Sequence, residues 1–103
     1  MAEITYPMNE ASETTSAPKR QTGIIMYSTT WCGDCRRSKK VFAALDVPYT
    51  EIDIEQHPEA AEIVRRLNNG MQRVPTILFP DGSILVEPSN AALEAKLASF
   101  VVR

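Results

Sequence analysis

The chain has 103 residues, of which 44% are hydrophobic, and its formal net charge is -2 at pH 7. This is enough apolar material for one small domain with a single core, and the slight negative charge argues against general nucleic-acid binding, which requires a basic surface. Two cysteines are too few for a disulfide-rich secreted framework. No apolar run approaches the roughly 18 residues of a membrane span.

The first 22 residues differ in composition from the rest of the chain. They are rich in Ser, Thr, Glu and Pro and lack a sustained periodicity, which predicts a disordered tail at 1–22 and a folded domain at 23–103. No basic segment followed by an apolar one is present, so the tail is not a secretory signal peptide. We therefore expect a cytoplasmic protein.

The folded part begins with a predicted strand at 23–28, GIIMYS, a short apolar run of the kind buried in a parallel sheet. A helix follows from about Cys32. Residues 47–54 alternate in polarity and predict a second strand. The buried face of the first helix is expected to carry Cys35, Ser38, Val41, Phe42 and Leu45.

A second helix is predicted to begin at Pro58, because proline is favoured at the first helical position and Glu59 and Glu62 suit the first turn. Residues 68–70, NNG, are predicted to end it. Its buried face should comprise Ala60, Ile63, Val64 and Leu67.

Residues 74–88, VPTILFPDGSILVEP, predict two short strands joined at the PDG turn. A last helix follows, with Ser89 or Asn90 as its N-cap. Its inward residues are expected to be Leu93, Leu97, Phe100 and Val101. A parallel βαβ unit followed by an antiparallel hairpin and a helix predicts an α/β fold of order βαβαββα. Its mixed four-stranded sheet should carry helices on both faces.

Cys32 and Cys35 form a C-x-x-C at the junction of the first strand and the first helix, a pattern typical of thioredoxin-like redox sites. A thiolate is the species that attacks a disulfide, and the N-terminus of a helix stabilises an anion. Cys32 is therefore the predicted nucleophile. Cys35, one turn deeper on the buried face, should keep its proton longer and then resolve the mixed disulfide.

Asp34 lies between the two cysteines. Its carboxylate suits the helix dipole but opposes a thiolate at Cys32, so it should destabilise the reduced, ionised pair. Three basic residues, Arg36, Arg37 and Lys39, act in the opposite direction but are screened by solvent. The balance predicts a moderately reducing pair.

Other uses of a C-x-x-C fit the sequence less well. Zinc requires four ligands, and the only histidine, His57, stands directly before a helix start. The element order does not match the βαββαβ fold of copper chaperones, and a disulfide across four residues removes little entropy from the unfolded chain. The remaining alternative to an enzyme is a metal or iron–sulfur module in which two chains share a site through Cys32.

The motifs WCGDC at 31–35 and RVPT at 73–76, in this order of elements, resemble the thioredoxin superfamily. Within it the chain is most similar to the glutaredoxin-like branch, and in particular to the mycoredoxins of actinobacteria and other dithiol glutaredoxins. The resemblance covers about residues 23–100. It implies a cis peptide bond between Val74 and Pro75, with the Val74 backbone pairing with the substrate beside the nucleophile. The expected substrate- or thiol-binding residues are Trp31, Gly33, Asp34, Arg73, Val74, Pro75, Ser89 and Asn90.

The sequence also departs from the glutathione-using members of that branch. They usually carry a lysine three residues before the first cysteine, where this chain has Thr29. Their last helix is preceded by a Gly-Gly-Cys-Asp-like segment, here EPSN at 87–90, in which Glu87 opposes an anion although Ser89 and Asn90 lie at a helix N-terminus. The electron donor is therefore left open between glutathione, mycothiol and a flavin-dependent reductase.

The expected function is a thiol–disulfide oxidoreductase that reduces protein disulfides, or mixed disulfides with a low-molecular-weight thiol. We expect a monomer without a bound cofactor or metal, whose partners are disulfide-containing proteins and a thiol or reductase, and not nucleic acids or membranes.

Overall fold

A computed structural model describes residues 22–101. The elements of this part of the chain are β2 (Ile25–Ser28), α1 (Gly33–Ala44), β3 (Thr50–Asp53), α2 (Pro58–Leu67), β4 (Thr76–Leu78), β5 (Ile84–Val86) and α3 (Asn90–Val101). The predicted order βαβαββα is confirmed. The predicted tail lies outside the described residues except for Thr22, whose hydroxyl donates to the Pro48 carbonyl oxygen at 2.7 Å.

The strands form one mixed sheet in the spatial order β3-β2-β4-β5. β2 pairs with β3 in parallel, and β4 is antiparallel to both β2 and β5. The parallel pair requires the α1 crossover, whereas the short β4–β5 connection allows an antiparallel hairpin. The predicted four-stranded sheet is therefore confirmed, with strands shorter at their ends than the sequence pattern suggested.

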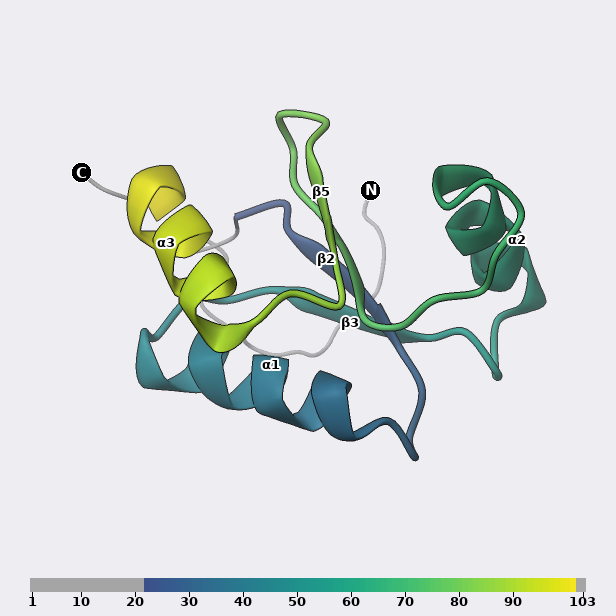
Figure 1. Ribbon diagram of the computed structural model, residues 1–103, viewed down its shortest axis with the longest axis horizontal. Coiled ribbons are helices and arrows are strands. Elements are labelled where there is room, and N and C mark those ends of the chain that lie inside the picture. Colours follow the sequence, from purple (N-terminus) through teal and green to yellow (C-terminus); the bar gives the residue numbers. More distant parts are fainter. Residues whose placement is uncertain (1–21, 102–103) are drawn as a thin grey trace, which may run out of the picture.

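The three helices cover both faces of the sheet, with α1 and α3 on one face and α2 on the other (Figure 1). The larger core lies under α1 and α3, and its buried residues are Ile24, Met26, Val41, Phe42, Val47, Ile77, Phe79, Leu93 and Leu97. The smaller core lies under α2 and is built from Tyr27, Ile54, Ala60, Ala61 and Val64. Burial on both faces of β2 fits its continuous apolar sequence.

Helix α1 buries Cys35, Ser38, Val41 and Phe42, as predicted. The prediction for Leu45 is wrong, because this side chain is 44% exposed. The helix ends at Ala44, so Leu45 is its C-cap, and the chain then turns at Asp46 with a left-handed φ of 57°. The helical periodicity that would bury Leu45 no longer applies there.

Helix α2 begins at Pro58 as predicted and buries Ala60, Ala61 and Val64, whereas Ile63 and Leu67 are half-buried. After its last turn, the Asn68 side-chain amide donates to the Val64 carbonyl oxygen at 2.9 Å and to Thr76 Oγ1 at 3.2 Å. This link fixes the end of α2 against the start of β4.

The PDG turn joins β4 to β5, and Gly82 adopts the left-handed conformation there, with a φ of 92°. Ser89 is the N-cap of α3, because the Ala92 N–H donates to its side-chain oxygen at 3.1 Å. Leu93 and Leu97 are buried as predicted. The side chains of Phe100 and Val101, predicted to point inward, lie outside the described residues.

Within residues 22–101 no helix combines the length and the apolar character that a membrane span requires.

Candidate active site

Cys32 and Cys35 lie where β2 leads into α1, and both are free and buried. Cys32 is the N-cap of the helix, and the Cys35 backbone N–H donates to its sulfur at 3.1 Å. The usual N-cap acceptor is an oxygen of Ser, Thr, Asp or Asn. Here a sulfur takes that place, so the nucleophile predicted from the sequence stands at the positive end of the helix dipole.

The other side of Cys32 faces the segment before β4. Its thiol donates to the Val74 carbonyl oxygen at 3.7 Å, across 42 residues of sequence. The Val74–Pro75 bond is cis, as the resemblance implied, and Pro75 is fully buried. The expected juxtaposition of the Val74 backbone with the first cysteine is therefore present.

Cys35 lies in a different environment, with no exposed surface. Burial raises the pKa of its thiol well above the ordinary value, and the hydrogen bond to the Cys32 side chain raises it further. The negative charges of Cys32 and Glu51 act in the same direction, whereas a hydrogen bond from the Thr29 backbone opposes them. Cys35 therefore holds its proton at neutral pH.

An open cleft of about 410 Å³ lies over Cys32. Its described lining residues come from the start of α1 and from the two segments beside it, and they are Trp31, Cys32, Gly33, Asp34, Gln72, Val74 and Glu87. Five of these seven belong to the predicted site. Gln72 was not predicted from the sequence to lie there, and Glu87 was expected only to oppose anions.

Four predicted binding residues do not line the cleft. Arg73 does not line the cleft; its guanidinium lies 3.9 Å from a Glu87 carboxylate oxygen. Ser89 and Asn90 form the start of α3 and are likewise not among the described lining residues. Pro75 is buried behind Val74 and has no surface on the cleft.

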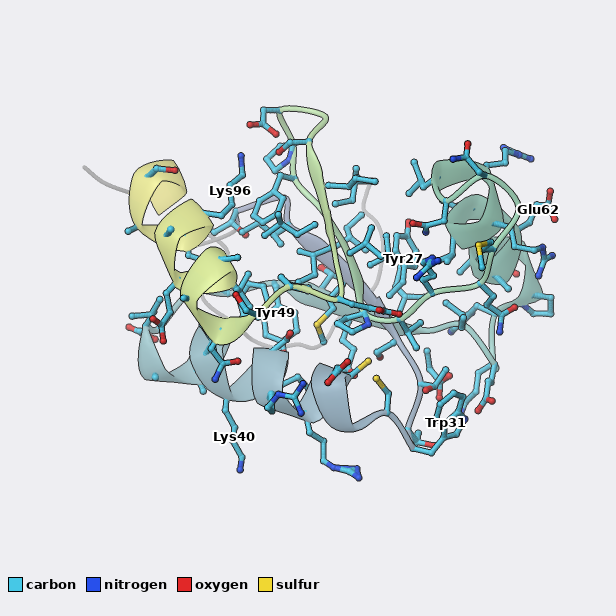
Figure 2. All side chains as sticks on the ribbon, viewed as in Figure 1. Tyr27, Trp31, Lys40, Tyr49, Glu62 and Lys96 are labelled. Atoms are coloured by element: carbon cyan, nitrogen blue, oxygen red, sulfur yellow. The ribbon has the colours of Figure 1, made fainter. Side chains whose placement is uncertain are left out.

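Trp31 forms one wall of the cleft and is 63% exposed. Figure 2 shows it beside the loop that leads into α1, far from Lys96 on α3. Its indole Nε1 donates to a Glu55 carboxylate oxygen at 2.9 Å. The ring is thus oriented by a residue that follows β3, although most of its surface faces solvent.

The charges around the pair are largely matched. Asp34 is ion-paired with Arg37 one turn along α1. Lys39 lies 3.1 Å from Glu51, which also accepts a hydrogen bond from Ser28. Two of the three cations expected to act on Cys32 are therefore engaged with carboxylates, and the Asp34 charge is partly neutralised.

Thr29, which replaces the lysine of the glutathione-using relatives, is 2% exposed. Its hydroxyl has no hydrogen-bond partner among the described residues. The carbonyl of Thr29 accepts from the Cys32 N–H at 3.4 Å, so this residue shapes the turn before the helix. It presents no positive charge to the site.

The described residues contain no group of three or more His, Cys, Asp or Glu side chains suited to a metal ion. His57 lies at the start of α2, where its Nδ1 is 3.6 Å from a Glu59 carboxylate oxygen.

The glutaredoxin family model matches residues 24–84. A Mycobacterium tuberculosis protein that carries the name glutaredoxin is 45% identical over 77 residues, which are 75% of this chain and 92% of that protein. Mycoredoxin 1 of Corynebacterium glutamicum is 34% identical over 77 residues, 75% of this chain and 95% of that protein. The glutaredoxin of Archaeoglobus fulgidus superposes with a TM-score of 0.61 at 18% identity, over 88% of this chain and all of that one.

Proposed function

The chain belongs to the glutaredoxin family of thiol oxidoreductases, and we propose that it reduces disulfides through the dithiol pair Cys32 and Cys35. The observation that carries this proposal is the asymmetry of the pair. Cys32 is at a helix N-cap and borders the open cleft, while Cys35 is fully buried behind it with its pKa raised.

In the first step the Cys32 thiolate attacks one sulfur of a substrate disulfide R–S–S–R′. The Cys32–S–R bond forms, the S–S bond of the substrate breaks, and R′ leaves as a thiolate that takes up a proton. The helix N-terminus stabilises the attacking anion. Val74 and Trp31 border the cleft in which the substrate lies.

In the second step Cys35 gives up its proton to solvent and its thiolate attacks the sulfur of Cys32. The Cys32–Cys35 bond forms, the Cys32–S–R bond breaks, and R leaves as a thiolate that takes up a proton. The charge of Cys32 and its hydrogen bond are among the causes that raise the pKa of Cys35. Both are lost once Cys32 is in a mixed disulfide, so the pKa of Cys35 falls at the moment when its thiolate is needed. The burial of Cys35 and its coupling to Cys32 thus place resolution after attack. The two steps convert one substrate disulfide into two thiols and leave a Cys32–Cys35 disulfide.

The Cys32–Cys35 disulfide then requires two electrons from a donor. We propose a low-molecular-weight thiol as that donor, with mycothiol as the first candidate because the chain is similar to Mycoredoxin 1. Thr29 in place of a lysine, and Glu87 at the cleft, are unfavourable for the carboxylates of glutathione. A flavin-dependent reductase is the other candidate.

The test compares the wild type with Cys32→Ser and Cys35→Ser in the reduction of insulin and of a mixed disulfide between a peptide and a small thiol. Cys32→Ser should abolish turnover of both substrates. Cys35→Ser should lose insulin reduction but retain the mixed-disulfide reaction, because Cys32 alone can exchange with a small thiol. The two variants are matched, since each replaces one sulfur by oxygen. Equal, mild losses in both would contradict the proposal.

The donor is identified by offering the oxidised wild type glutathione, mycothiol and a thioredoxin reductase in parallel. Mycothiol should reduce it fastest. The same preparation, purified without oxygen, also tests the metal-sharing alternative. Visible absorbance together with a dimer would favour a shared iron–sulfur cluster through Cys32, and a colourless monomer would favour the oxidoreductase.

A further inference from the structure

The charged side chains that line the cleft all carry negative charge. Among its described lining residues, Asp34 and Glu87 are acidic and none is basic. The two carboxylates approach from different parts of the chain, the first turn of α1 and the segment after β5. A small thiol bound over Cys32 therefore shares the cleft with both carboxylates.

The two carboxylates are not equivalent. Asp34 is directly ion-paired with Arg37 on its own helix, so much of its charge is compensated. Glu87 is only loosely matched, because its carboxylate oxygen lies 3.9 Å from the Arg73 guanidinium. A pair at this distance between half-exposed side chains contributes little and leaves a field at the cleft. Glu87 is thus the stronger source of negative potential there.

The position of Glu87 is fixed by the backbone. Its N–H donates to the Pro75 carbonyl oxygen at 2.9 Å, and its φ is 50°. Few residues other than glycine and asparagine adopt this left-handed conformation readily. The hydrogen bond therefore anchors the Glu87 backbone next to the cis-proline segment, with its side chain on the cleft.

Arg73 is the cation that would otherwise serve an anionic ligand beside Val74. Its guanidinium faces Glu87 and does not line the cleft. A carboxylate on an incoming thiol would therefore meet the charge of Glu87, and no basic side chain is among the described lining residues to offset it. An uncharged thiol has no such penalty, and its hydroxyls can donate to the carboxylates of Asp34 and Glu87.

We propose that Glu87 determines the thiol specificity of this site by excluding carboxylate-bearing thiols in favour of uncharged, hydroxyl-bearing ones. This inference rests on the proposed oxidoreductase function and adds to it a residue that discriminates between small thiols. Glu87 acts through its charge on the substrate, and the reacting sulfurs remain those of Cys32, Cys35 and the disulfide.

The experiment measures single-turnover oxidation of the reduced protein by three symmetric disulfides in excess. These are glutathione disulfide, which carries carboxylates; hydroxyethyl disulfide, which is uncharged; and cystamine, which is cationic. In each reaction the disulfide gains two electrons and becomes two thiols, while Cys32 and Cys35 become a disulfide. Alkylation and mass spectrometry follow the loss of free cysteine. The readout is the rate with each charged disulfide divided by the rate with hydroxyethyl disulfide, so any change in the reactivity of Cys32 cancels.

Glu87→Gln should raise the ratio for glutathione disulfide by about three- to tenfold and lower the ratio for cystamine. The substitution removes one negative charge near the reacting sulfur, and solvent screens that charge only in part. The rise should collapse in 1 M salt. Asp46→Asn is the matched control. It removes one negative charge at the far end of α1, a helix of 12 residues and therefore about 18 Å long, and should leave both ratios unchanged.

The double variant Glu87→Gln/Arg73→Gln separates repulsion by Glu87 from attraction by a released Arg73. We expect at least half of the rise in the glutathione disulfide ratio to persist in the double variant. A complete return to the wild-type ratio, an unchanged ratio in Glu87→Gln, or an equal rise in Asp46→Asn would each overturn the inference. A wild type that reacts with none of the three disulfides would instead contradict the proposed function.

Discussion

The buried thiol of Cys35 should make the stability of the reduced protein depend on pH in the alkaline range. Burial and the neighbouring Cys32 raise the pKa of Cys35 from 9.0 to about 12 in the folded chain. In the unfolded chain both causes are absent. Between pH 9 and pH 12 the unfolded state loses the Cys35 proton and the folded state keeps it. The stability that Cys35 contributes is therefore fully present below pH 9 and is lost progressively as the pH rises toward 12.

The loss of stability at a given pH depends only on how far the Cys35 thiol of the unfolded chain is ionised, as long as the same thiol in the folded chain remains protonated. The unfolded thiol is about half ionised at pH 9 and about nine-tenths ionised at pH 10, which corresponds to losses of about 0.4 and about 1.4 kcal/mol. The slope approaches about 1.4 kcal/mol per pH unit above that. Cys35→Ser keeps a hydroxyl that does not ionise in this range, so it should lack this loss.

The assay is urea denaturation of the reduced wild type and of reduced Cys35→Ser between pH 7 and pH 10.5. Burial also raises the pKa of Tyr27 and Tyr49, so both proteins should lose some stability at high pH. That loss is common to the two, and the difference between them isolates Cys35. Curves that remain parallel from pH 8 to pH 10.5 would refute the argument that the fold holds the proton on Cys35.

Two further predictions concern the first turn of α1 and the wall of the cleft. Asp34→Asn should raise the reduction potential of the pair by about 10 mV, because one carboxylate acting through water on the reduced, ionised pair is worth about 0.5 kcal/mol. Equilibration with a dithiol redox buffer measures this potential, and a fall in it would contradict the reasoning. Glu55→Ala removes the acceptor of the Trp31 indole N–H, so time-resolved fluorescence anisotropy of this single tryptophan should show faster local motion, whereas an unchanged decay would mean that the bond does not hold the ring.

The position of the redox pair was predictable from the sequence because it depends on local structure. A C-x-x-C after a short apolar strand fixes both the helix start and the burial of Cys35 one turn later. The helix start at Pro58 and the N-cap at Ser89 are local signals of the same kind, and both are confirmed. Leu45 was misplaced because periodicity indicates which face of a helix is buried but not where the helix ends.

The composition of the cleft was less predictable, because it depends on contacts between segments far apart in the chain. Gln72 reaches the cleft from a loop with no periodic pattern, and Glu87 reaches it through the β4–β5 pairing. Arg73 was expected to bind the thiol because it adjoins Val74. Gln72 and Val74 line the cleft, whereas the Arg73 guanidinium lies beside the Glu87 carboxylate, a contact across 14 residues that adjacency to Val74 does not reveal. The boundary of the folded domain and the cytoplasmic location stay predictions.

The reactivity of the pair therefore depends on two opposing features of one helix start. The sulfur of Cys32 caps the helix, and an ionised sulfur is a better acceptor for the Cys35 N–H than a sulfur in a disulfide. The cap thus stabilises the reduced form and makes the pair less reducing. Asp34, in the same turn, opposes the same anion, but its pairing with Arg37 limits how far it can do so. Since the cap is a backbone interaction and the carboxylate is an exposed side chain, substitution at Asp34 should tune the potential in small steps without changing which cysteine attacks.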